Sequence, residues 1–308
     1  MVNRWTVIGD ATVDIIVRPS QLPRPGGDVA ARIAVGPGGQ GANVAVRLAR
    51  LGATVALAAP IAEDAVGTWL AEILRADGVE VARLPAERSS SVVILLDAAG
   101  ERSMLSDRQL LPADGVPKAL GGADWIHASA YPLLDDRGGD PLVEALRRRP
   151  GGSRLSVAGG SIPPDRELVD RFRARLATAA PDLLLVSLDE ATSLLGGPVA
   201  SAAAAAAALR GTADGVVVTA GTAGSAAVAE GHALEVQATT ADGPMIDATG
   251  AGDAFLAALL WALAPEPWPP DAEVLRTAMQ RASQAGAEAA RVMGAQGPIR
   301  LEDRADGS

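Results

Sequence analysis

Cysteine is absent from this chain of 308 residues, and histidine and lysine are rare. The lack of cysteine excludes disulfides, thiolate catalysis and cysteine-ligated zinc. The two histidines, His127 and His232, are too few for a histidine-rich metal site. The single lysine, Lys118, is not part of a G-x-x-x-x-G-K-[ST] motif, so a P-loop kinase is excluded as well.

The chain also lacks long hydrophobic runs and an excess of positive charge. Its longest apolar runs, 202–209 and 254–264, are shorter than the roughly 20 residues that span a bilayer. Lys and Arg number 27 against 37 Asp and Glu, which gives a net charge of −10. Such a surface repels nucleic acids and anionic membranes. We therefore expect a soluble cytoplasmic protein with neither nucleic acid nor membrane as a partner.

Hydrophobic residues make up 48% of the chain and charged residues 21%, so there is enough apolar material for a large packed core. Two pairs of segments alternate between apolar and polar residues, 13–17 with 29–35 and 91–96 with 102–106. This alternation is typical of half-exposed antiparallel strands. Because the pairs come from separated parts of the chain, we expect one small sheet that stands away from the main body.

The rest of the sequence alternates short apolar strands with helices. Strands are expected at 5–8, 54–58, 125–128, 155–157, 183–186 and 215–219. Helices are expected at 42–51, 66–77, 140–149, 165–177, 201–209 and 271–293. This order predicts an α/β fold with a mostly parallel sheet covered by helices on both faces. The expected domains are a body of residues 1–12, 37–88 and 113–308, and a small β domain of residues 13–36 and 89–112.

The strongest chemical signal is the run Asp-Ala-Thr-Gly-Ala-Gly-Asp-Ala-Phe at 247–255, which leads into an apolar segment. Glycines before a helix let the backbone approach a ligand, and the first N–H groups of the helix attract an anion. Gly250, Ala251 and Gly252 therefore predict an anion hole for a transferring phosphoryl group. Asp253 in the first turn can accept a hydroxyl proton beside that hole. The competing interpretation is an ordinary glycine-rich loop with an acidic helix start.

A second glycine-rich run, Gly-Pro-Gly-Gly-Gln-Gly-Ala-Asn at 36–43, has two interpretations. Its glycines fit the G-x-G-x-x-G pattern of a dinucleotide site, with Glu63 and Asp64 about 20 residues further on. An NAD-dependent oxidoreductase is therefore one alternative. Against it, the preceding segment alternates and carries Arg32, unlike a fully buried first strand, and Pro37 removes a backbone donor from the turn.

Together and in this order, the two glycine-rich runs resemble the paired signatures of the ribokinase-like (PfkB) carbohydrate kinase family. The resemblance covers nearly the whole chain. It implies a three-layer α/β/α body with a small β lid, and transfer of a phosphoryl group from ATP to a hydroxyl, usually a primary alcohol, of a sugar. It also implies Mg²⁺ with the ATP, K⁺ in many members, and homodimers that pair through the lid.

The resemblance assigns roles to residues of this sequence. Asp253 is implied as the catalytic base, beside the anion hole already described. The implied sugar contacts are Asp14, Gly39 and Asn43. An Asp and an Asn suit neighbouring hydroxyls, because hydroxyls both donate and accept hydrogen bonds.

The nucleotide and metal sites are also implied by the resemblance. The implied ATP contacts are Thr219, Gly221, Gly224 and, at the adenine pocket, Ser283. Family members usually carry Asn-x-x-Glu where this chain has Ser187 and Glu190. Glu190 keeps its implied role near Mg²⁺ and the phosphates, whereas the change to serine weakens any detailed account of that shell. The implied monovalent cation site has Asp247 and Thr249, closed by Gly294 and Ala295.

The sequence leaves the substrate and two isolated side chains open. Arg108 follows the lid strands, so it either contacts a substrate carboxylate or hydroxyl or is solvated, whereas His127 is expected to be structural. A simple sugar such as ribose, fructose or a keto-deoxy sugar acid is the leading substrate, and Arg108 favours an anionic or highly hydroxylated one. A nucleoside kinase on the same fold is the near alternative. Aromatic residues, at 3%, leave little to stack on a base. Besides the oxidoreductase, a non-catalytic sugar- or nucleotide-binding protein is possible, but such a protein has no need of Asp253 in an anion hole.

Overall fold

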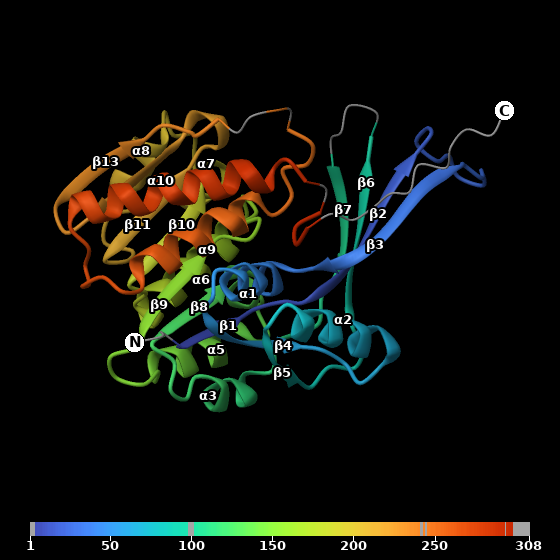
Figure 1. The fold of residues 1–308 in the computed structure, drawn as a ribbon, viewed down its shortest axis with the longest axis horizontal. Coiled ribbons are helices and arrows are strands. Elements are labelled where there is room, and N and C mark those ends of the chain that lie inside the picture. Colours follow the sequence, from blue (N-terminus) through green and yellow to red (C-terminus); the bar gives the residue numbers. More distant parts are fainter. Residues whose placement is uncertain (1–3, 98–101, 241–242, 244, 293, 298–308) are drawn as a thin grey trace.

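The computed structural model describes residues 4–97, 102–240, 243, 245–292 and 294–297. It has two parts, a large α/β body and a small four-stranded sheet that stands beside it (Figure 1). We call the small sheet the lid. Within the described residues, no helix is long and apolar enough to cross a membrane.

The body is built on a nine-stranded sheet in the order β13-β12-β11-β10-β9-β8-β1-β4-β5. Its strands are β1 (Arg4–Ile8), β4 (Thr54–Pro60), β5 (Glu80–Leu84), β8 (Trp125–Ser129), β9 (Arg154–Ala158), β10 (Leu183–Ser187), β11 (Gly215–Thr219), β12 (Ser225–Ala229) and β13 (His232–Val236). All neighbours from β5 to β11 pair in parallel, and β12 and β13 add an antiparallel edge. The predicted mostly parallel sheet is therefore confirmed.

Helices cover both faces of this sheet. The central strands carry apolar side chains on both faces, so each face must be shielded from water by its own layer of helices. One face packs against α1 (Gln40–Arg50), α2 (Ala65–Ala76), α9 (Ala251–Leu263) and α10 (Ala272–Ala289). The other packs against α3 (Val116–Ala119), α4 (Ala130–Leu134), α5 (Gly139–Arg147), α6 (Arg166–Ala179), α7 (Leu188–Leu195) and α8 (Ala202–Ala208). Two 3₁₀ turns complete the described elements, η1 (Ala113–Gly115) and η2 (Gly221–Ala223).

The lid contains β2 (Thr12–Pro19), β3 (Ala31–Gly38), β6 (Ser90–Leu96) and β7 (Arg102–Asp107), in the order β3-β2-β6-β7. The two sequence-local pairs, β2 with β3 and β6 with β7, are antiparallel as predicted. The central pair, β2 with β6, is parallel, and the alternation within each pair gave no prediction of this pairing. Two hairpins from distant parts of the chain meet here along strands that run in the same direction. Most of the predicted turn at 97–100 lies outside the described residues.

The lid and the body meet where the first strand of the body ends. β1 is followed at once by Gly9 to Ala11 and then by β2, so the chain passes directly from the body into the lid. β3 leads back through Gly39 into α1. The glycine-rich run at 36–43 is therefore the return from the lid to the body. The run begins within β3, a strand of the lid. A dinucleotide-binding unit requires instead a glycine-rich turn after a buried strand of the body.

Candidate active site

A cavity of about 170 Å³ lies between the lid and the body. It is lined by Thr12, Asp14, Gly39, Gln40, Asn43, Val92, Ile94, Met104, Arg108, Tyr131, Thr249, Gly250 and Asp253. The lining therefore includes side chains from the lid, from the start of α1 and from the start of α9. These three elements are far apart in sequence, and the fold brings the two glycine-rich runs together at this cavity.

The start of α9 has the backbone expected of an anion site. Gly250, the N-cap, has φ 74°, and a side chain there would place its Cβ 2.7 Å from the Cα of Ala295. In the described part of the chain, the N–H groups of Gly252 and Asp253 donate to no protein acceptor, whereas the N–H of Ala251 donates to the carbonyl of Ala248 at 3.2 Å. Two unpaired amides of the first turn are thus available to a negatively charged group.

Asp253 is held beside these amides by Asn43 of α1, whose Nδ2 donates to Asp253 Oδ2 at 2.8 Å. Burial is the main reason that the pKa of Asp253 is raised to about 7. The hydrogen bond from Asn43 and the charge of Arg47 oppose this rise, whereas the carboxylates of Asp10 and Glu190 add to it. A carboxyl group with a pKa near neutrality is well suited to accept and release a proton.

Asp14 enters the cavity from β2. Thr12 Oγ1 donates to Asp14 Oδ1 at 2.7 Å, and a side chain at Gly38 on the neighbouring strand would overlap the carboxylate. Burial raises the pKa of Asp14, and Asp10 contributes to the rise, while Thr12 and Arg108 oppose it. The carboxylate is therefore fixed by its neighbours and directed into a confined polar space.

Arg108 bridges the lid and the body. Its Nε donates to Asp10 Oδ2 at 3.0 Å, and its guanidinium lies over the ring of Tyr131, 4.1 Å from the ring centre. Asp10 is 5% exposed and also accepts from the backbone N–H of Gly41. The alternative of a solvated Arg108 is therefore wrong. That Arg108 contacts the substrate stays a prediction.

The side chain of Glu190 is occupied by backbone donors. Ser187 caps α7 in a capping box: Ser187 Oγ accepts from the N–H of Glu190 at 3.2 Å, and Glu190 Oε2 accepts from the N–H of Ser187 at 2.7 Å. Glu190 Oε1 accepts from the N–H of Ser161 at 2.9 Å. Serine and asparagine are both favoured helix caps, so Ser187 fills the capping role that an asparagine could also fill.

The predicted nucleotide residues lie outside the described cavity. Thr219 ends β11, Gly221 begins the turn η2 that follows it, and Gly224 comes directly after this turn. Ser283 lies on α10, where its hydroxyl accepts from the N–H of Thr239 at 2.8 Å and ties the loop after β13 to the helix. None of these four residues is among the described residues that line the cavity, and their role in ATP binding stays a prediction.

The predicted cation loop is closed around Asp247. Asp247 Oδ1 accepts from the N–H and the hydroxyl of Thr249, at 2.9 and 2.5 Å, and Oδ2 accepts from the N–H of Gly294 at 2.9 Å. Within the described residues, no three His, Asp or Glu side chains are grouped so that they could hold a metal ion. The carboxylate of Asp247 already accepts from three protein donors, and binding of K⁺ at this loop stays a prediction.

Several residues of this region were not predicted as site residues, although Gln40 lies within the second glycine-rich run. Gln40 accepts from the hydroxyl of Ser129 and donates to the carbonyl of Gly159, linking α1 to β8 and β9. Asp10 and Tyr131 were also missed, although the Gly9-Asp10 pair at the end of a buried strand was a usable signal. His127 is fully buried on β8, where burial lowers its pKa to about 3, in line with a structural role.

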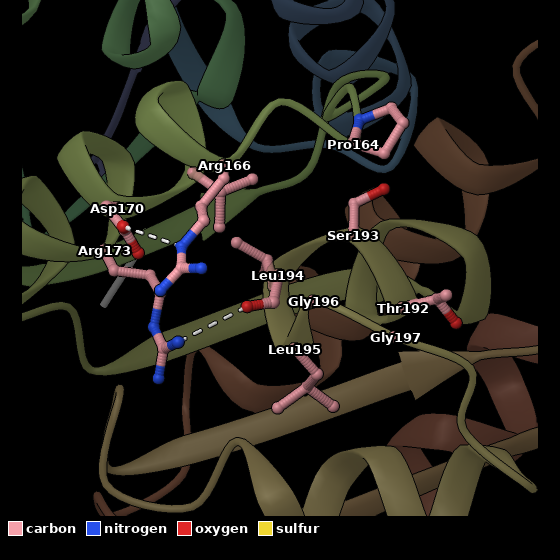
Figure 2. A pocket seen from close by; sticks show the side chains of 11 residues that line it. Pro164, Arg166, Asp170, Arg173, Thr192, Ser193, Leu194, Leu195, Gly196 and Gly197 are labelled. Atoms are coloured by element: carbon pink, nitrogen blue, oxygen red, sulfur yellow. Dashed lines mark hydrogen bonds and ion pairs between the residues drawn. The ribbon is translucent and has the colours of Figure 1, made fainter.

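A second groove, of about 520 Å³, lies between α6 and α7 (Figure 2). Its charged groups are paired with one another or with the backbone. Arg166 lies 3.9 Å from Asp170, and Arg173 donates to the carbonyl of Leu194 at 3.5 Å. None of the sequence-predicted site residues lines this groove, so the candidate active site is the smaller cavity under the lid.

The comparisons with known proteins agree with this geometry. The model of a family described as pfkB family carbohydrate kinase matches residues 3–302. The chain belongs to this family. Its members transfer phosphoryl groups to sugars, so the predicted ATP-dependent sugar kinase is confirmed. The dinucleotide-dependent oxidoreductase and the non-catalytic binding protein are set aside.

The relatives within the family act on more than one substrate. Fructokinase of Klebsiella pneumoniae is 30% identical to this chain, covering 96% of each. Aminoimidazole riboside kinase of Salmonella typhimurium is 29% identical, covering 98% of this chain and 93% of its own. Among solved structures, ribokinase of Giardia lamblia superimposes with a TM-score of 0.81 at 18% identity, covering 97% of each chain. These similarities confirm the ribokinase-like fold.

Proposed function

We propose that this kinase transfers the γ-phosphoryl group of MgATP to a primary hydroxyl of a small neutral sugar, with Asp253 as the catalytic base. The observation that carries the proposal is the position of Asp253. Its carboxyl group has a pKa of about 7, lines the cavity, and belongs to the helical turn whose amides are unpaired. A base and an anion site in one turn match the two needs of phosphoryl transfer to an alcohol.

In the proposed reaction, the ionised carboxylate of Asp253 takes the proton of the sugar hydroxyl as the new oxygen–phosphorus bond forms. The bond between the γ-phosphorus and its bridging oxygen breaks, and ADP leaves with that oxygen. The free amides of Gly252 and Asp253 stabilise the charge on the transferring group. Mg²⁺, when bound with ATP, neutralises phosphate charge, and Glu190 is the residue that we place near it. We place K⁺, when bound, at the loop of Asp247 and Thr249.

The charges of the cavity support a neutral substrate. Arg108 is already paired with the buried Asp10, so no uncompensated positive charge faces the cavity from this side chain. Asp14 adds a carboxylate that would repel an anionic substrate and can accept from sugar hydroxyls. A polyhydroxylated neutral sugar therefore fits better than a sugar acid.

Cavity size supports a monosaccharide over a nucleoside. At about 170 Å³, the cavity is smaller than the roughly 300–1,000 Å³ of sites for drug-sized ligands. Tyr131, the aromatic residue in its lining, is already stacked by Arg108 and offers no free face on that side. A sugar such as fructose is therefore our leading substrate, as several relatives are fructokinases. A riboside is the second candidate, since another relative is a riboside kinase.

The two faces of the lid suggest different roles. Ala34, Ile16, Ile94 and Met104 form one row across the four strands, and Ile94 and Met104 line the cavity. The adjacent row, on the opposite face, is Val35, Ile15, Val93 and Leu105, of which Leu105 is 63% exposed. The first row would exclude water from the reaction. We propose that the second row pairs with a second copy of this chain.

The proposed function also includes a dimer and a cytoplasmic location. Light scattering should report a dimer that Leu105→Lys converts to a monomer, because a charge would be buried in the apolar contact. A monomeric wild-type protein would contradict the pairing. Use of ATP supports a cytoplasmic location, where ATP is plentiful.

The proposed function is tested by ADP release from MgATP, with potassium present, against fructose, other hexoses, pentoses, sugar acids and ribosides. The proposal predicts turnover with a neutral monosaccharide and none with sugar acids. Turnover that is confined to ribosides would select the second candidate. Turnover in Asp253→Asn equal to that of the wild type would reject the base.

A further inference from the structure

The segment 294–297 lies along α1, close to the base. Asn43, Arg47 and Arg50 are spaced three or four residues apart and so share one face of the helix. Arg47 donates to the carbonyl of Ala295 at 2.8 Å, and Arg50 donates to the carbonyl of Gln296. The segment is therefore held to α1 by two arginines through its backbone.

The side chain of Gln296 makes a third contact, of a different kind. Its Nε2 donates to Asn43 Oδ1 at 2.9 Å, while Asn43 Nδ2 donates to Asp253 Oδ2 at 2.8 Å. Asn43 thus joins two side chains, each more than 200 residues from it in the sequence, in one chain of hydrogen bonds. Asn43 and Gln296 are each 5% exposed, so water does not easily replace either bond.

The direction of these hydrogen bonds follows from their chemistry. An ionised carboxylate only accepts hydrogen bonds, so Asn43 must turn its NH₂ end to Asp253. The other end of the same amide is then an acceptor and needs a donor, which Gln296 supplies. If the amide of Asn43 turned over, its oxygen would face the carboxylate and the two would repel each other.

Stability alone does not explain the buried amide of Gln296. In the described part of the chain its Oε1 has no hydrogen-bond partner. A buried polar atom without a partner destabilises a fold. An apolar residue of similar length would avoid this cost but would lose the donor to Asn43.

We propose that Gln296 is a positioning residue for phosphoryl transfer. It fixes the amide of Asn43 so that Nδ2 faces Asp253 Oδ2. In the described part of the chain, Asp253 Oδ1 accepts no protein hydrogen bond and stays open to the sugar hydroxyl. The inference rests on the proposed role of Asp253 as the base.

The first test replaces Gln296 by methionine, which has similar length and no donor. Without the hydrogen bond from Gln296, the amide of Asn43 can turn over. In the turned orientation, Asn43 Nδ2 no longer donates to Asp253. We expect kcat to fall by about 10- to 100-fold, the size of effect that a small misplacement causes. The acid limb of the pH profile of kcat should also move to higher pH, because the bond from Asn43 lowers the pKa of Asp253. Asp10, Arg47 and Glu190 are unchanged in this variant.

The matched control is Arg50→Met, which loosens the same segment without touching the amide of Asn43. It should lower Tm, change kcat by less than about twofold and leave the acid limb in place. If Arg50→Met and Gln296→Met behave alike, loosening of the segment is the cause and the inference is overturned. Gln296→Glu serves as a second variant: its carboxylate cannot donate to Asn43 Oδ1, so kcat should fall at least as far. Wild-type turnover in this variant would also overturn the inference.

The closing experiment is a double-mutant cycle of Asn43→Ala and Gln296→Met, run beside Asp253→Asn. If Gln296 acts through Asn43, the double variant has the kcat of Asn43→Ala alone. If the two losses multiply, Gln296 acts independently and the inference is wrong. Wild-type turnover in Asp253→Asn would show that Asp253 is not the base, and this inference would then be rejected as well. Asp253→Asn without turnover, together with a fully active Gln296→Met, would overturn this inference alone.

Discussion

The body and the lid contribute to the same cavity but are stabilised very differently. The body has large apolar clusters on both faces of its sheet, whereas the buried cluster of the lid consists of Ile16, Val92 and Ile94. Asn43 and Asp253 are therefore fixed by a packed core. Asp14 and Arg108 depend on a sheet with few buried contacts and on the pair of Arg108 with Asp10. We therefore expect the phosphoryl transfer to depend on the rigid body, and closure over the sugar to depend on the lid, whose few buried contacts predict low local stability.

The largest effect on kcat should come from a substitution in the body. Asp253→Asn keeps the shape of the side chain but removes the base, and loss of a general base lowers rates by about 10²–10⁴. We expect kcat to fall by about 10³ with no loss of Tm. The measurement is steady-state ADP release beside a thermal melt of both proteins. A fall in kcat that follows a fall in Tm would assign Asp253 to the fold instead.

A smaller effect, on binding of the sugar, should come from a substitution next to the lid. Arg108→Met removes the pair with Asp10 and the contact with Tyr131. We expect KM for the sugar to rise by about tenfold with kcat less affected. The reason is that the interaction stabilises the bound sugar in the ground state and in the transition state to the same degree. Arg88→Met is the matched control, since Arg88 pairs with Asp107 on the lid surface and does not line the cavity. Equal changes in the two variants would contradict the account.

The smallest effect on activity should come from truncating the two cores. Leu57→Ala in β4 removes a fully buried side chain of the body and should lower the free energy of unfolding by about 2–5 kcal/mol. Ile94→Ala should lower global stability less and raise KM for the sugar, since Ile94 lines the cavity. Chemical denaturation and steady-state kinetics measure both. If Ile94→Ala destabilises as much as Leu57→Ala, the lid and the body form one cooperative unit.

The sequence predicted the body well where apolar runs were uninterrupted, as in β10 and β11. It missed β5 (Glu80–Leu84), whose short apolar pattern is broken by Arg83, and the β12–β13 edge hairpin, which is rich in alanine and follows a parallel sheet. The parallel pairing of β2 with β6 could not be predicted, because it joins residues of two hairpins that are 78 positions apart in the chain, such as Thr12 and Ser90. The two-residue period of apolar side chains predicts which face of a strand is buried, but it does not predict which strands pair with it.

The candidate site shows the same limit. The glycines before α9 and Asp253 were identified because their chemistry is local to one turn. Asp10 and Gln296 were not, because each acquires its role from a partner far away in the sequence, Arg108 in one case and Asn43 in the other. A side chain whose function is to hold another can be recognised only when the fold has placed both.

The central claim is that Asp253 acts as an ionised base, and the pH dependence of kcat tests it most directly. Burial raises the pKa of Asp253 to about 7, so the ionised fraction, and with it the rate, should fall as the pH drops below that value. The measurement is kcat for the preferred sugar at saturating MgATP between about pH 5 and pH 9. The account predicts an acid limb near pH 7 that is absent from the residual activity of Asp253→Asn. A flat wild-type profile across this range, or the same limb in both proteins, would contradict it.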